Sequence, residues 1–164
     1  MTDTPVAGFD RDYYLDESGT LEHLLEICQD AALGAGLAAK AVASYPEMAD
    51  FFERIAAERN EFSTHLALLL EHTARDPHFE GNGTFRGKLF HWRLRFAAVF
   101  ADYLTIDGNV LEATLGIARH GAGHVLKAYE EAEGRPLSTE SRREVHRQAE
   151  HIRTTSARIY ELAK

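Results

Sequence analysis

Apolar residues recur along this chain at intervals of three and four, which is the spacing of one face of an α-helix. The pattern predicts five helical segments, over about 20–43, 46–75, 84–105, 110–132 and 138–162. No segment has the strict apolar–polar alternation that is typical of a half-buried strand. We therefore expect an all-α helical bundle.

Residues with strong preferences for helix ends mark the boundaries of these segments. Pro46 stands where the second segment begins, and Asn109 is suited to cap the N-terminus of the fourth. Gly134 and Pro136 predict the end of that helix, and Ser138 or Thr139 begins the last one. The expected helices are thus joined by short connections at 44–46 and 134–138.

Apolar stripes on three segments predict much of the core. The expected core positions are Leu21, Leu24, Leu25, Cys28, Ala31, Ala32, Ala35, Ala39, Val42, Met48, Phe51, Ile55, Phe62, Leu66, Leu69, Val145, Ala149, Ile152 and Ile159. The last stripe also carries Gln148, Thr155 and Ser156, which are suited to a buried network of hydrogen bonds. Cys28 lies on the first stripe, so we expect an inert buried thiol.

The segment 84–105 differs from the others because apolar side chains cover about two thirds of its circumference. It is expected to be an additional apolar helix between the two helical hairpins of the bundle. Such a helix is either central in the fold or part of a subunit interface, and we predict a homodimer contact through Leu89–Tyr103. A small-molecule pocket lined by Trp92, Phe96 and Tyr103 is a further hypothesis.

Length and composition fit one domain. The chain has 164 residues, of which 45% are hydrophobic and 27% charged; we predict a polar N-terminal arm over 1–19 and a single bundle domain over 20–164. The formal net charge of −8 argues against nucleic-acid binding, which needs clustered basic residues. No apolar run suggests a secretory signal or a membrane span, and the single cysteine excludes a disulfide framework, so we expect a cytoplasmic protein.

Two groups of side chains are candidates for metal binding, with iron or zinc as the metal. Glu58, Glu61 and His65 lie along one flank of segment 46–75, where the last two either share a metal or form an ordinary i, i+4 pair. His120 and His124 have the i, i+4 spacing of a chelating histidine pair, or are edge residues beside a tight helix contact at Gly121. A site shared by both groups requires the two segments to be neighbours.

Several short sequence features, spread over residues 21–162, together carry a resemblance to a known family through their order and spacing. The matching residues are Leu24-Leu25-Glu26, Cys28-Gln29-Asp30, Glu58-Arg59, the region 83–92, Ala128-Tyr129, Arg147-Gln148, Arg158-Ile159 and Leu162. By these features the chain resembles a bacterial family of uncharacterised ferritin-like four-helix-bundle proteins. The resemblance implies a ferritin-like antiparallel bundle.

The same resemblance indicates that several acidic positions of the family are occupied by other residues here. Acidic side chains of the family correspond to Ala32, Ala122 and Gly123, and a histidine corresponds to Ser156. Two functions follow as hypotheses. The first is a non-enzymatic bundle that acts as a binding or interaction protein. The alternative is a metal-binding or di-iron protein that acts in metal or oxidative stress.

Overall fold

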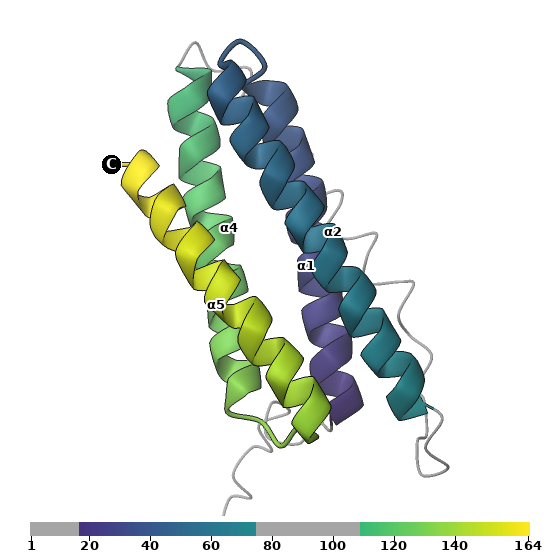
Figure 1. Ribbon diagram of the computed structural model, residues 1–164. Coiled ribbons are helices and arrows are strands. Elements are labelled where there is room, and N and C mark those ends of the chain that lie inside the picture. Colours follow the sequence, from purple (N-terminus) through teal and green to yellow (C-terminus); the bar gives the residue numbers. More distant parts are fainter. Residues whose placement is uncertain (1–16, 75–108) are drawn as a thin grey trace, which may run out of the picture.

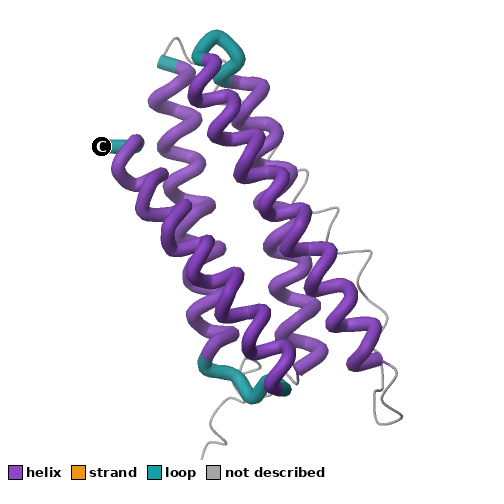
Figure 2. The backbone as a smooth tube through the Cα atoms, viewed as in Figure 1, coloured by secondary structure: helices purple, strands orange, loops and turns teal. Residues whose placement is uncertain are grey.

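The computed structural model describes residues 17–74 and 109–164 (Figure 1). These residues form the helices α1 (Glu17–Ala41), α2 (Pro46–Ala74), α4 (Val110–Glu133) and α5 (Thr139–Leu162). Within these two ranges no residue belongs to a strand (Figure 2). The all-α prediction is confirmed for these ranges, and the boundaries of the four predicted helices that fall in them lie within one turn of the observed ones.

Several predictions fall outside the described residues. They are the apolar helix at 84–105, the dimer contact at Leu89–Tyr103, the pocket at Trp92, Phe96 and Tyr103, and residues 1–16 of the N-terminal arm. The remaining arm residues, 17–19, form the first turn of α1. None of the helices in the described ranges is long and apolar enough to cross a membrane.

The helix ends follow the local signals of the sequence. Pro46 is the first residue of α2, a position where its missing N–H is not needed. Asn109 caps α4 by accepting a hydrogen bond from the Leu111 N–H at 3.2 Å. Ser138 caps α5 by accepting from the Ser141 N–H at 3.3 Å, and its hydroxyl donates to a carboxylate oxygen of Glu17 at 2.6 Å. The turn before α5 is thereby tied to the start of α1.

The four helices form two antiparallel hairpins that lie side by side. The hairpin α1–α2 turns through residues 42–45, and the hairpin α4–α5 turns through 134–138. α1 also packs against α4, and α2 contacts α5 to a smaller extent, whereas α2 and α4 lie on a diagonal without contact (Figure 1). The last residue of α2 and the first residue of α4 lie at opposite ends of the bundle (Figure 1).

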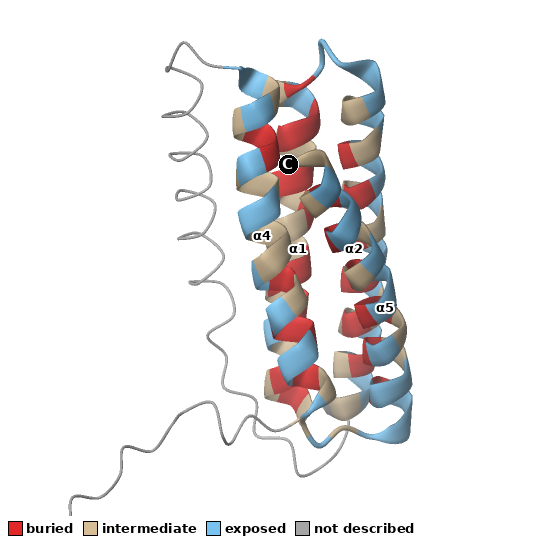
Figure 3. Cartoon of the chain, turned by 90° about the vertical axis from the view of Figure 1, so that its left-hand side faces the viewer, coloured by how far each residue is buried: buried red, intermediate tan, exposed pale blue. Residues whose placement is uncertain are grey.

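The core consists of two apolar clusters along the bundle (Figure 3). All four helices contribute to both, and the second lies toward the turn between α1 and α2. Most of the predicted stripe is buried; Ala31, Met48, Phe51 and Thr155 are only partly buried. Phe52, which the stripe omitted, is 1% exposed.

The close helix contact expected at Gly121 is instead found at Gly123. A Cβ atom on Gly121 would meet no heavy atom within 4 Å, but one on Gly123 would lie 2.9 Å from the Tyr160 hydroxyl of α5. Arg119 lies over the Tyr160 ring, with its guanidinium carbon 5.7 Å from the ring centroid. The close contact lies at Gly123 because α5 approaches α4 on the flank that carries this residue.

This difference predicts opposite responses to alanine. Gly121→Ala should raise the free energy of unfolding by about 0.5–1 kcal/mol, because alanine is the better helix former and the new methyl group is unobstructed. Gly123→Ala should gain less or destabilise, because Tyr160 has to move. Urea denaturation followed by circular dichroism measures both variants. An equal gain in the two would contradict the assignment of the close contact to Gly123.

Candidate functional site

A chain of hydrogen bonds crosses the centre of the bundle and connects three helices. The Cys28 thiol of α1 lies 2.9 Å from the Tyr129 hydroxyl of α4, which donates to Gln148 Oε1 of α5 at 2.6 Å. Because the single tyrosine proton is used toward Gln148, the thiol is the donor in its bond to Tyr129. All three residues have 0% exposure. We call the set formed by Cys28, Tyr129, Gln148, Glu144 and His65 the core polar chain.

Burial governs the protonation of the inner members. It raises the pKa of the Cys28 thiol to about 11, although the hydrogen bond with Tyr129 and the positive charge of Arg59 act in the opposite direction. Burial likewise raises the pKa of Tyr129 well above its ordinary value. Both groups are therefore neutral at physiological pH. The expectation of an inert buried thiol at Cys28 agrees with this environment, and Gln148 lies in the buried network that was predicted for it.

The core polar chain reaches the surface at Glu144. Gln148 Nε2 donates to Glu144 Oε1 at 2.8 Å and to the Phe62 carbonyl at 3.5 Å. Arg147 forms a two-point contact with the same carboxylate, at 2.7 and 3.0 Å. Burial alone would raise the pKa of Glu144, but hydrogen bonds from Arg147, Gln148 and His65 outweigh it and lower the pKa to about 2.

His65 of α2 is the last member of the core polar chain at this end. Its Nδ1 lies 2.9 Å from Glu144 Oε1 and 3.0 Å from Arg147 Nη2, and one nitrogen cannot donate to the first and accept from the second. We assign the N–H to Nδ1 because a bond to a carboxylate is the stronger of the two. His65 thus links α2 to α5.

Arg59 places a positive charge inside the bundle. Its side chain is only 4% exposed and pairs with Glu58. Its guanidinium carbon lies 5.4 Å from the centroid of the Phe62 ring, and that of Arg147 lies 5.5 Å from the same centroid. A buried arginine is stable only when it is paired. Arg59 lies four residues after Ile55 and three before Phe62, on the apolar stripe of α2, but it is not among the predicted core positions.

The candidate metal ligands of α2 are each directed to α5. Glu58 lies 3.3 Å from His151 Nδ1, Glu61 lies 4.0 Å from Arg147 Nη2, and His65 contacts Glu144 as described above. The predicted alternative, an i, i+4 pair between Glu61 and His65, is therefore replaced by contacts across the two helices. The reason is the antiparallel packing of α2 on α5, which brings charged partners opposite this flank.

The candidate ligands of α4 do not join those of α2. His120 and His124 are exposed, and α4 does not contact α2. The condition for a shared site, that these helices are neighbours, is not met. Across residues 17–74 and 109–164, no three His, Cys, Asp or Glu side chains are grouped so that they could hold a metal ion. Iron or zinc binding stays a prediction for these residues.

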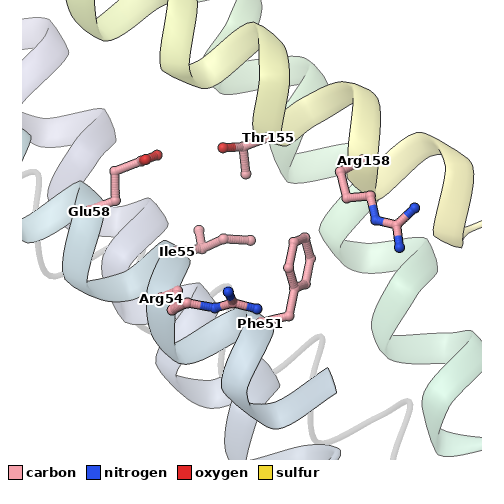
Figure 4. A pocket seen from close by; sticks show the side chains of 6 residues that line it. All are labelled: Phe51, Arg54, Ile55, Glu58, Thr155 and Arg158. Carbon is pink, nitrogen blue, oxygen red and sulfur yellow. The ribbon is translucent and has the colours of Figure 1, made fainter. Parts of the chain in front are cut away.

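An open groove lies between α2 and α5, beyond the Glu58–His151 pair (Figure 4). Its volume is about 350 Å³, and its lining residues are Phe51, Arg54, Ile55, Glu58, Thr155 and Arg158. The groove exists because α2 and α5 make the smallest of the helix interfaces in the described bundle. Sequence reasoning missed it, since Phe51 and Thr155 were both assigned to the core.

No protein-family model, curated protein or solved structure matches this chain. The ferritin-like resemblance therefore stays a prediction.

The depressed pKa of Glu144 predicts a loss of stability in acid. Since its folded-state pKa of about 2 lies below the usual value near 4.3, its contribution is full above about pH 5 and is lost as the pH falls toward 2. After allowance for solvent screening the contribution is on the order of 1–2 kcal/mol. Urea denaturation between pH 7 and acid should show a flatter pH dependence for Glu144→Gln than for wild type.

Glu150→Gln is the matched control for this experiment. Glu150 pairs with Arg153 on the same helix, but its side chain is 59% exposed. The free energy of unfolding of Glu150→Gln should change with pH in the same way as that of wild type. Parallel profiles for wild type and Glu144→Gln would contradict the assigned role of Glu144.

Proposed function

We propose that this protein is a non-enzymatic ferritin-like bundle that acts by binding, and that it does so as a homodimer. The proposal rests on which side chains occupy the centre of the bundle. Di-metal carboxylate bundles direct four glutamates and two histidines inward at this level. Here the corresponding space holds the core polar chain and the guanidinium of Arg59.

Charge supports this proposal. A divalent cation in the bundle centre would lie near the buried positive charge of Arg59, and like charges repel strongly where solvent screening is weak. The members of the core polar chain are also bonded to one another. Tyr129 and Gln148 are bonded in sequence, and the carboxylate of Glu144 is occupied by Arg147. Binding a metal there would break several hydrogen bonds between buried groups.

The direction of the helices supports the ferritin-like part of the proposal. Because α2 ends and α4 begins at opposite ends of the bundle, a short turn cannot join the two hairpins (Figure 1). One long crossover between two helical hairpins is the connectivity of ferritin-like folds. The predicted apolar helix at 84–105 belongs to this connection.

The metal-binding alternative is tested by reconstitution. The protein is incubated with Fe(II) without oxygen, or with Zn(II), desalted and analysed for metal. We expect clearly less than one metal ion per chain. Retention near one or two ions that is lost in Glu58→Gln/Glu61→Gln/His65→Gln or in His120→Gln/His124→Gln would overturn the proposal and establish a metal-binding protein.

The dimer is tested separately by light scattering at tens of micromolar protein. The proposed contact is the apolar surface of Leu89–Tyr103, so Phe96→Glu should shift a dimer to the monomer mass because it buries a charge in that contact. A wild-type protein that is monomeric in this range would refute the dimer and leave the proposal of a binding bundle standing.

A further inference from the structure

Two arginines face the groove between α2 and α5, one from each wall. Arg54 comes from α2 and Arg158 from α5, and Figure 4 shows both beside Phe51. The groove also contains one carboxylate, Glu58, on the side away from Arg158 (Figure 4). Two arginines against one carboxylate give the lining residues a net charge of about +1, in a chain with a net charge of −8. Such a site selects anions.

Both guanidinium groups are available to a ligand. Arg54 donates its Nε to the Asp50 carbonyl at 3.4 Å, and its two terminal amino groups have no partner among the described residues. Arg158 pairs with Glu161 at 3.1 Å, but the two side chains are 58% and 61% exposed. Exposed pairs of this kind contribute little to stability. An anion can therefore replace Glu161 as the partner of Arg158.

Glu58 is not available in the same way. Its carboxylate is held by the buried Arg59 and by His151. It closes one side of the groove with negative charge that its partners keep in place. A second negative charge on a ligand would approach this carboxylate, so the groove favours a ligand with a single anionic group.

Apolar side chains form the wall beside the arginines. Ile55 is 9% exposed, and Phe51 packs against Phe52 with the ring centroids 5.5 Å apart. From Phe51 to Glu58 the lining follows α2 for roughly 10 Å, at 1.5 Å per residue. The volume of about 350 Å³ lies at the small end of the range of ligand pockets, roughly 300–1,000 Å³. The groove thus suits a short apolar chain.

We propose that the groove binds an amphipathic organic monoanion, a medium-chain carboxylate. The carboxylate pairs with the arginines that flank Phe51, and its chain lies along Phe51 and Ile55 (Figure 4). Planar guanidinium groups match carboxylates because they donate two parallel hydrogen bonds. This inference rests on the proposed binding function and adds the site and the class of ligand.

Isothermal titration calorimetry with octanoate tests the proposal. Wild-type protein should bind one octanoate per chain. Butanoate, octyltrimethylammonium and octanedioate should each bind at least about tenfold more weakly, which corresponds to about 1.4 kcal/mol. They lack, respectively, the apolar length, the negative charge and the single anionic end. Equal binding of octyltrimethylammonium would overturn the proposal, because the arginines would then have no role.

Two variants locate the site. Arg54→Gln/Arg158→Gln should weaken octanoate binding at least about tenfold, or about 1.4 kcal/mol. Thr155→Trp should also weaken it, because the indole fills the groove and leaves both arginines in place. The control is Arg142→Gln/Arg143→Gln, which makes the same change in charge at exposed positions of α5 and should bind within twofold of wild type. Circular dichroism melting verifies that each variant is folded.

The outcomes separate this inference from the proposed function. Octanoate binding that is unchanged in both groove variants, or no octanoate binding by wild type, would overturn the groove proposal alone. Stoichiometric metal retention in the reconstitution experiment would overturn the non-metal function. It would not alter the comparison of groove and control variants with octanoate.

Discussion

The hydrogen bond from Tyr129 to Gln148 is the contact on which the arrangement of this bundle depends. It joins α4 to α5 inside the core, and through Cys28 at one end and Glu144 at the other it extends to α1 and α2. Apolar packing alone tolerates rotation and sliding of helices, but a buried polar group without its partner costs roughly 1–3 kcal/mol. The core polar chain therefore specifies one alignment of the four helices.

This alignment also explains why the groove lies where it does. Polar contacts join α2 to α5 at successive levels, from His65 and Glu144 to Glu58 and His151. Beyond the pair of Glu58 and His151, the groove lined by Arg54 and Arg158 separates these two helices. The polar contacts thus hold α2 and α5 together at one end, while toward the other end these two helices leave space for a ligand.

Much of the fold could be predicted from the sequence, whereas the partners of the polar side chains could not. Periodicity and capping residues such as Asn109 and Ser138 act within a few residues, so the helices and their ends follow from local physics. The burial of Gln148 was also foreseeable from its place on an apolar stripe. The burial of Arg59 was not, because an arginine in an apolar stripe looks like a surface residue until the partner helices are placed.

The same reasoning explains the fate of the candidate metal ligands. Spacing along one helix shows that Glu61 and His65 can meet, but whether they do depends on the competing groups that the next helix presents. Here α5 offers Arg147 to Glu61 as the partner of an ion pair and Glu144 to His65 as the partner of a hydrogen bond. The i, i+4 spacing is therefore necessary for a metal pair but not sufficient. The groove was unpredictable for a related reason, because it arises from the divergence of two helices that are far apart in sequence.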